Sequence, residues 1–467
     1  MPEMKQEHVF KLATIFVILF AYFYHDPGEY IDLSPVTRSA SAIAPARAAI
    51  EALPKGPTTA ERRRGFKKAV GLTLKQFPSV RQVIVSLNGD EKFDDESGAT
   101  EKLDLKKQLP SFTRVLLLEQ SAETSANVSI GDLNGDGFLD LVLAKGRHWP
   151  LIDRVLLNDG HGRFPVAHNL GEVADRSYSV TLADIDRDGD LDVVVGNDAP
   201  DPKRVYANDG KGNFHLVSTF GRPEWPTRNA SVADVNHDGL PDIIVANRTG
   251  DTNGANYVCF NKGKGQFDAD CLAFSHESAT TITPADMNGD GFVDLIVPHR
   301  DGGQSYVYIN DGKGGFGRRI PFGPNDAAFR VSEAADFNDD GVMDIVAIDE
   351  RRGTFICFGQ RNRQFSSMVA IQSESGSKAA MPYALTVGDL NRDGAIDVVV
   401  GNVEAPSVVY FNDGTGQRFT PVTFGDNKGT VYGFAIGDLD RDGFLDIATA
   451  RSDAPNVVYF GGVSSHR

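Results

Sequence analysis

The stretch Asp132-Leu-Asn134-Gly-Asp136-Gly137-Phe-Leu-Asp140 fits the pattern D-x-[DN]-x-[DN]-G-x-x-D, and the chain of 467 residues carries seven copies of it. The later copies begin 49 to 53 residues apart, at Asp184, Asp234, Asp286, Asp336, Asp389 and Asp438. A regular period of this size indicates a repeat architecture. The repeat therefore decides how the chain is organised.

The residue types in this nine-residue loop indicate calcium binding. Oxygen-bearing side chains at positions 1, 3, 5 and 9 and a backbone carbonyl at position 7 suit Ca²⁺, which takes about six to eight oxygen ligands. Glycine at position 6 permits the left-handed turn around the ion. An EF-hand would place a Glu at position 12 before a helix, whereas apolar runs such as Val193-Val-Val195 follow here and predict a strand. A solvated turn would explain one copy but not seven.

We therefore predict about seven structural Ca²⁺ sites. Their predicted side-chain ligands are Asp132, Asn134, Asp136, Asp140, Asp184, Asp186, Asp188, Asp192, Asp234, Asn236, Asp238, Asp242, Asp286, Asn288, Asp290, Asp294, Asp336, Asn338, Asp340, Asp344, Asp389, Asn391, Asp393, Asp397, Asp438, Asp440, Asp442 and Asp446. Much of the net charge of −17 lies on these residues. An acidic chain of this kind argues against a nucleic-acid partner, which favours a basic surface.

The segments between the loops predict β-strands. Each unit has an apolar strand, the loop, a short apolar run, a polar connection, and a hairpin such as Asn208-Asp209-Gly210 before a fourth strand. Four strands in about 50 residues, repeated seven times, predict an all-β seven-bladed β-propeller. Gly or Ala precedes every loop, as expected where inner strands crowd a central axis. The last unit lacks a fourth strand, and residues 112–118 have the pattern to supply it beside residues 456–460.

The N-terminal part of the chain lacks the repeat. Residues 12–24 are uncharged and mostly apolar, so we interpret residues 1–24 as a signal peptide or a membrane anchor, with cleavage left open. Residues 25–110 are interpreted as a spacer, partly helical at 46–53 and 60–77 or disordered, and residues 111–467 as the propeller. The predicted localisation is extracytoplasmic, either secreted or anchored in a membrane.

Three cysteines do not make a disulfide framework. Cys259 and Cys357 occupy equivalent apolar positions in two units, which favours buried small side chains. A bridge between Cys259 and Cys271 is the alternative, but the pair looks about three residues out of register across the hairpin.

The repeats resemble the FG-GAP/VCBS family, which includes the propeller head of integrin α subunits. The resemblance rests on the loops, on Asn-Asp-Gly-x-Gly-x-Phe hairpins, and on Phe-Gly pairs such as Phe220-Gly221 and Phe424-Gly425, and it covers residues 111–467. The fifth hairpin, at Gly359 to Phe365, departs from the pattern. The resemblance implies a Ca²⁺-stabilised extracellular recognition scaffold and names no ligand.

A recognition face is expected at the end of the propeller opposite the loops. Six residues before and five residues after each loop, polar, aromatic or arginine side chains predominate and would suit a sugar, a peptide or an acidic group. An ordinary hydrated rim is the alternative. The candidate ligand-binding residues are Tyr178, Asn197, Arg228, Asn247, His299, Arg330, Asp349, Tyr383, Asn402, Tyr432 and Arg451.

These features favour a binding module for carbohydrate or protein ligands, with an unknown oligomeric state. A propeller polysaccharide lyase using a basic residue such as Lys145, His299, Arg228 or Arg330 is the enzymatic alternative, and a structural envelope component is the third. The sequence contains no G-x-S-x-G, H-E-x-x-H or phosphate-binding motif, so no catalytic residue is assigned.

Overall fold

The computed structural model describes residues 82–83, 103–104, 109–250, 254–366, 368–371 and 380–463. The chain divides into two compact units, Met1–Gln108 with Arg392–Gly394, and Leu109–Asn391 with Ala395–Arg467. In the first unit, β1 (Gln82–Val83) pairs antiparallel with β2 (Leu103–Asp104). The apolar segment at 12–24 and the predicted helices at 46–53 and 60–77 lie outside the described residues. Within the described ranges, no helix has the length and apolarity needed to cross a membrane.

The second unit is built of antiparallel β-sheets, five of them four-stranded and one eight-stranded. The four-stranded sheets are β4 (Ser125–Gly131), β5 (Asp140–Lys145), β6 (Arg154–Leu157) and β7 (Val166–Asn169); β8 (Ser177–Ala183), β9 (Asp192–Asn197), β10 (Lys203–Asn208) and β11 (Phe214–Phe220); β12 (Thr227–Ala233), β13 (Asp242–Asn247), β14 (Asn256–Cys259) and β15 (Leu272–Ser275); β16 (Thr283–Ala285), β17 (Asp294–Val297), β18 (Ser305–Ile309) and β19 (Arg318–Phe322); β20 (Phe329–Ala335), β21 (Asp344–Asp349), β22 (Gly353–Cys357) and β23 (Val369–Ala370).

The eight-stranded sheet contains two further sets of four strands. They are β24 (Met381–Gly388), β25 (Asp397–Val403), β26 (Ser407–Asn412) and β27 (Phe419–Phe424), and β28 (Thr430–Gly437), β29 (Asp446–Ser452), β30 (Val457–Gly462) and β3 (Ser111–Leu117). A single residue pair, Val403 with Thr430, joins the two sets.

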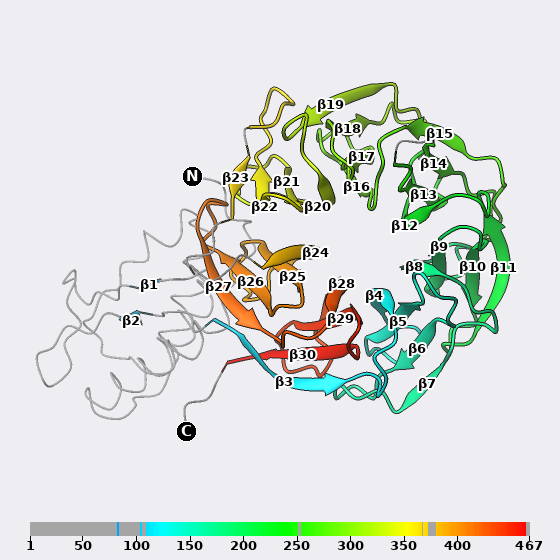
Figure 1. The fold of residues 1–467 in the computed structure, drawn as a ribbon, viewed down its shortest axis with the longest axis horizontal. Coiled ribbons are helices and arrows are strands. Elements are labelled where there is room, and N and C mark those ends of the chain that lie inside the picture. The colour runs from blue at the N-terminus through cyan, green and yellow to red at the C-terminus, as the bar shows by residue number, and fades with distance from the viewer. Residues whose placement is uncertain are drawn as a thin grey trace, which may run out of the picture. The chain divides into compact units, whose positions relative to one another are not determined.

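The sheets are arranged around a centre, with the first strand of each set innermost (Figure 1). Each of β4, β8, β12, β16, β20 and β24 contacts the next first strand in the chain, and β28 contacts β4. The first strands therefore form a closed ring, which makes the fold an all-β propeller of repeated four-stranded sheets.

The second strands form the centre of each sheet. In β5, β9, β13 and β21 every residue is buried, as expected for apolar runs covered on both faces. The core lies between adjacent sheets. One cluster, for example, packs Val142 and Val155 of the first sheet against Val193 and Tyr206 of the second.

The closing strand confirms the prediction for residues 112–118. In β3, Arg114, Val115, Leu116 and Leu117 pair with residues 457–460 of β30 in antiparallel register. The ring is thus closed by a strand from the start of the repeat region, and the outer edge of β30 is covered.

The small residue before each loop has a different reason from the one expected. A Cβ atom on Gly131 would lie 2.6 Å from Leu191 Cδ1, and one on Gly437 would lie 2.6 Å from Ile130 Cδ1. Since Leu191 and Ile130 belong to the following sheet in the ring, side-chain packing between sheets, and not crowding at the axis, excludes larger residues here.

Candidate functional site

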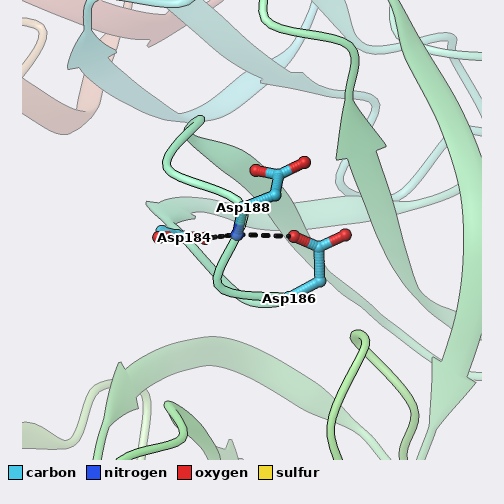
Figure 2. A group of neighbouring side chains, drawn as sticks. All are labelled: Asp184, Asp186 and Asp188. Atoms are coloured by element: carbon cyan, nitrogen blue, oxygen red, sulfur yellow. Dashed lines mark hydrogen bonds between the residues drawn. The ribbon is translucent and has the colours of Figure 1, made fainter.

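The nine-residue loops join the first strand to the second strand of each set. In the second loop, Asp184 Oδ1 accepts a hydrogen bond from the Asp188 N–H (3.0 Å) and Asp184 Oδ2 accepts one from the Gly189 N–H (3.2 Å). Asp186 Oδ1 also accepts from the Asp188 N–H, at 3.2 Å (Figure 2). The first Asp therefore folds the loop around its own carboxylate. The equivalent contact to the sixth-position glycine recurs at Asp132, Asp234, Asp286, Asp336 and Asp438.

The oxygen atoms of these loops fit a hard cation. In the second and seventh loops, three carboxylates each place an oxygen within 4.8 Å of the others, at Asp184, Asp186 and Asp188 and at Asp438, Asp440 and Asp442 (Figure 2). Burial, and then the neighbouring carboxylates, raise the pKa of Asp186 and of Asp442. In the fourth loop, the buried Oδ1 atom of Asn288 has no hydrogen-bond partner. A divalent cation would relieve both the repulsion and the unpaired oxygen.

The ninth-position Asp is buried in every loop and has a structural role of its own. Asp140 Oδ2 accepts the Leu133 N–H (2.9 Å) in the loop, and Asp140 Oδ1 accepts the Asn158 N–H (2.7 Å) at the end of the third strand. Burial raises the pKa of Asp140 to about 6. The same bridge is made by Asp192, Asp242, Asp294, Asp344, Asp397 and Asp446.

The Asn that opens each Asn-x-Gly hairpin joins neighbouring sheets, which was not anticipated from the sequence. Asn208 Nδ2 donates to the Leu133 carbonyl of the preceding sheet's loop (2.8 Å) and to the Leu191 carbonyl of its own loop (3.0 Å). Asn158, Asn261, Asn310 and Asn412 make the same pair of contacts. The sequence signal for this contact was the recurrence of Asn at the same hairpin position, because a turn alone does not require Asn there.

At the ends of the first strands opposite the loops, arginine and tyrosine side chains contact one another in series, joined by Arg147 from the turn after β5. We call Arg147, Tyr178, Arg228, Arg330, Tyr383 and Tyr432 the axial cluster. In β8, Tyr178 and the loop stand at the two ends of the strand, roughly 17 Å apart at about 3.3 Å per residue. Five of the six were predicted from the sequence, and Arg147 was missed because it lies outside the repeat position.

Cation–π and aromatic contacts connect the axial cluster. The guanidinium carbon of Arg330 lies 3.3 Å from the Tyr383 ring centroid, and the Tyr383 and Tyr432 centroids are 4.9 Å apart. The Arg147 guanidinium carbon lies 3.6 Å from the Tyr432 centroid and 5.6 Å from that of Tyr178. On the other side of Tyr178, Arg228 stands at 4.3 Å. All six residues keep some exposure, but the side chains of Arg228 and Arg330 are only 16% and 14% exposed, so the cluster is fixed and in part accessible.

The polar residues at the C-terminal ends of the second strands have a different role from the one expected. Asn197, Asn247, Asp349, Asn402 and Arg451 are buried and hold local connections, so they are not placed to contact a ligand. Asn402 Nδ2, for example, donates to the Pro406 carbonyl (2.6 Å), and Arg451 pairs with Asp426 (2.7 Å). Polar residues recur here because each connection needs internal hydrogen bonds.

Lys145 and His299, which were considered as catalytic bases, do not join the axial cluster. Lys145 is buried and its Nζ atom lies 2.5 Å from Glu119 and 3.2 Å from Glu123. The backbone N–H of His299 donates to Ser305 Oγ (2.9 Å). The buried Nδ1 atom of the His299 ring has no hydrogen-bond partner. Neither residue makes a ring or ion-pair contact with the axial cluster among the described residues.

Tyr383 and Tyr432 have opposite pKa shifts. Burial acts to raise the pKa of the Tyr383 hydroxyl, but the Arg330 charge and a hydrogen bond with Tyr432 outweigh it, so the net pKa is lowered. Burial raises the pKa of Tyr432 to about 12. Beyond burial, both shifts reflect the hydrogen bond that the two hydroxyls share next to the Arg330 charge.

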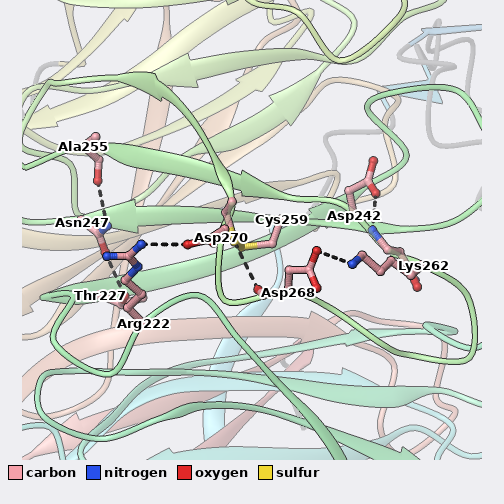
Figure 3. Close-up of a disulfide and its surroundings, with 11 residues drawn as sticks. Arg222, Thr227, Asp242, Asn247, Ala255, Cys259, Lys262, Asp268 and Asp270 are labelled. Atoms are coloured by element: carbon pink, nitrogen blue, oxygen red, sulfur yellow. Dashed lines mark hydrogen bonds and ion pairs between the residues drawn. A yellow bond between two sulfur atoms is a disulfide. The ribbon is translucent and has the colours of Figure 1, made fainter.

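The prediction of an unbridged Cys259 was wrong. Cys259 and Cys271 form a disulfide, with Cα atoms 4.5 Å apart (Figure 3). Val258 pairs with Leu272, so the next residues, Cys259 and Cys271, lie opposite each other. This register is possible because the residues before Cys271 leave the hairpin, where the Asp268 carbonyl accepts the Gly221 N–H (3.2 Å) of the preceding sheet. The expected mismatch of about three residues came from assuming that the two strands stay paired all the way to the hairpin turn. Cys357 is a buried free thiol as predicted, and burial raises its pKa to about 11.

The fold and the loops together define a repeat-built β-propeller. The sequence model described as the FG-GAP-like repeat matches residues 132–195, 188–245, 234–297, 286–347, 336–400 and 389–449. The chain therefore belongs to the FG-GAP-like repeat family, which confirms the resemblance seen in the sequence. No curated protein sequence matches the chain.

Solved structures of low sequence identity also match the chain. The structure of BBS1N in complex with ARL6DN matches with a TM-score of 0.52 and 12% identity, covering 77% of this chain and 99% of that chain. An Agrocybe aegerita lectin, described as recognising non-reducing terminal N-acetylglucosamine, matches with a TM-score of 0.48 and 22% identity, covering 71% and 86%. Identities this low concern the fold alone.

Proposed function

We propose that this chain is an exported, Ca²⁺-stabilised, seven-bladed β-propeller that binds a carbohydrate or protein ligand through the axial cluster. The observation that carries the proposal is the contact series Arg330–Tyr383–Tyr432–Arg147 at the end opposite the loops, in which each guanidinium lies over a tyrosine ring and the two rings meet edge to face. Tyrosine and arginine are the side chains most often dominant in binding energy. Because these mutual contacts already fix the side chains, a ligand would meet a preorganised surface.

The proposed ions stabilise the scaffold and take no part in chemistry. Each would be held by side-chain oxygens at loop positions 1, 3 and 5, such as Asp184, Asp186 and Asp188, with the buried ninth Asp supporting them. At a Ca²⁺ concentration about tenfold above the dissociation constant, each site would add about 1.4 kcal/mol. A full set would add about 10 kcal/mol, which is comparable to the net stability of a whole domain.

Two features support export. Residues 12–24 form the apolar run expected of a signal peptide or membrane anchor. The Cys259–Cys271 disulfide is typical of proteins that mature in an oxidising compartment. Both features favour an extracytoplasmic chain, secreted or anchored.

The proposal is tested by a Tyr383→Ala/Tyr432→Ala double variant applied to a panel of polysaccharides and surface proteins. The variant should keep the Ca²⁺-dependent melting of the wild type and lose at least tenfold in affinity for any retained ligand. Tyr306→Ala is the matched control, because Tyr306 also packs under an arginine, Arg319 at 4.0 Å, but on the third strand of its sheet. Unchanged binding by a folded double variant would place the partner elsewhere.

A second candidate function is polysaccharide elimination, favoured by the contacts of Tyr383 with Tyr432 and with Arg330. Arg330 would neutralise a uronate carboxylate while Tyr383, as the phenolate, takes the proton from the carbon next to it. A carbon–carbon double bond would form as the glycosidic C–O bond breaks, and the Tyr432 hydroxyl would give its proton to the departing oxygen. Tyr383→Phe would then abolish unsaturated products, seen by ultraviolet absorbance, and retain binding. The absence of unsaturated products from any acidic polysaccharide that the wild type binds would exclude this activity.

A further inference from the structure

The inference that follows rests on the proposed recognition function and concerns the charge of the ligand. Five guanidinium groups gather at the axial end, those of Arg147, Arg228, Arg248, Arg300 and Arg330, and three carboxylates face them, those of Asp198, Asp301 and Glu350. Asp198 pairs with Arg228 at 2.5 Å, and Glu350 pairs with Arg300 at 2.7 Å and Arg330 at 3.2 Å. This end therefore carries excess positive charge, although the chain as a whole has a net charge of −17.

Arg147 carries the uncompensated charge. No described carboxylate pairs with it, and its Nε atom is buried without a hydrogen-bond partner. One Nη atom lies 3.1 Å from His148 Nε2, and the other is 3.5 Å from Ser452 Oγ. The buried Nε atom is out of a ligand's reach, but the exposed Nη side beside His148 can donate parallel hydrogen bonds to a carboxylate or sulfate.

The turn that presents Arg147 is tightly built. The Trp149 N–H donates to the Gly146 carbonyl (2.8 Å), and a Cβ atom on Gly146 would lie 2.3 Å from the Trp149 carbonyl oxygen. Arg147 itself has a φ of 46°, in the left-handed region. Its guanidinium then fits between Tyr432 and Tyr178, in the unit where the repeat position holds only Ala126. A strained, fixed backbone that places one cation is a feature of binding sites.

Trp149, on the same turn, adds an aromatic surface. Its side chain is 69% exposed, the most exposed among the large apolar residues of the described chain. The apolar C–H face of a sugar ring packs well against such a ring. We propose that the turn from Gly146 to Trp149, with Tyr178 and Tyr432, binds an acidic saccharide, with Arg147 taking its carboxylate or sulfate group and Trp149 packing against a sugar face.

The test is calorimetric titration of the Ca²⁺-loaded protein with oligogalacturonate, its carboxyl-reduced analogue, sulfated and neutral dextran, and poly-glutamate. Arg147→Asn removes the cation and suits a positive φ, so it should fold. The matched control is Arg418→Asn, an 84% exposed arginine on a hairpin next to the loops. The wild type should bind an acidic oligosaccharide, and affinity should fall at least tenfold with Arg147→Asn or Trp149→Ala and stay unchanged with Arg418→Asn.

Several results would overturn the inference. The neutral analogue or poly-glutamate could bind as tightly as the acidic saccharide. Alternatively, Arg147→Asn could leave acidic-saccharide binding intact, as expected if Ca²⁺ in the loops bound the acidic groups. Failure to bind any acidic saccharide would also overturn it. In each case the proposed function is judged separately, because it depends on ligand loss in the Tyr383→Ala/Tyr432→Ala variant. Comparison of oligogalacturonate with sulfated dextran identifies whether a carboxylate or a sulfate is preferred.

Discussion

Val115 in β3 pairs with Tyr459 in β30, so one sheet joins the start of the repeat region to its end. Phe112 of the same strand is buried, with its ring centroid 5.3 Å from that of Phe424 in the neighbouring set of strands. Phe112→Ala should lower the free energy of unfolding by about 3–5 kcal/mol because it leaves a cavity at the closing sheet. Urea denaturation measures this. Val115→Thr, at a 50% exposed position of the same strand, is the control, and equal effects would show that closure contributes little.

Asn208→Ala tests the contacts between sheets. The Asn208 side chain satisfies two carbonyls, those of Leu133 and Leu191, and removing it should destabilise the protein by about 1–3 kcal/mol. Asn213→Ala is the control, since Asn213 is exposed and its amide donates only to Asp209 of the same hairpin. If both variants unfold at the same urea concentration, the Asn contacts between sheets are not stabilising.

Asp153→Asn should give a pH-dependent gain in stability. Asp153 accepts hydrogen bonds from the Lys145 N–H (2.7 Å) and Ser177 Oγ (2.9 Å), and burial raises its pKa to about 7. Because this folded-state pKa exceeds the unfolded value of about 3.9, the stabilising contribution of the proton is complete below about pH 4 and is lost as the pH rises towards 7. The variant should therefore gain more in melting temperature over the wild type at pH 8 than at pH 5.

In the set formed by β28, β29, β30 and β3, the position equivalent to Asp153 is occupied by Asn456, which shows that Asn suits it. Asn456 Oδ1 accepts the Arg451 N–H (2.7 Å), and Asn456 Nδ2 donates to Ser125 Oγ (2.8 Å), the same arrangement with an uncharged amide. Asp270→Asn, at an 85% exposed side chain, serves as the control. A melting difference for Asp153→Asn that is equal at both pH values would show that Asp153 does not titrate in this range.

Much of the fold could be predicted because the loop recurs with its flanking strands in order. The position of residues 112–118 followed from the missing fourth strand of the last unit, and β3 lies there. The axial positions of Tyr178, Tyr383 and Tyr432 followed from the same register. In contrast, the Asn208–Leu133 contact joins two repeats, and a repeat pattern alone does not say which side chains meet across sheets.

Departures from the repeat could not be predicted from the repeat. The Cys259–Cys271 bridge depends on a local detour of the chain near Asp268, and Arg147 reaches the axial cluster through a turn that other units lack. Polar residues such as Asn197 and Arg451 were assigned to a ligand because their recurrence was visible, whereas their burial was not. Recurrence indicates a shared environment and does not distinguish a structural contact from a binding contact.

The disulfide gives a further prediction. Denaturation without reductant should expose one titratable thiol per chain, that of Cys357, and reduction should expose three. Reduction should also cost about 3 kcal/mol of stability, as expected for a short closed loop. A Cys259→Ala/Cys271→Ala variant should be insensitive to reductant. Three thiols before reduction would contradict the bridge.

Calcium-dependent melting tests the central claim, that the seven loops are ion sites which hold the propeller together. Chelation should lower the melting temperature by more than about ten degrees, because about 10 kcal/mol of binding free energy would be lost. Asp188→Ala should cost only a small share of this, and Asp209→Ala, at a hairpin Asp outside the loops, should leave the chelator-induced fall in melting temperature unchanged. Restoring Ca²⁺ should restore the melt with about seven ions bound per chain. An unchanged melt in excess chelator would show that the loops are turns without ions.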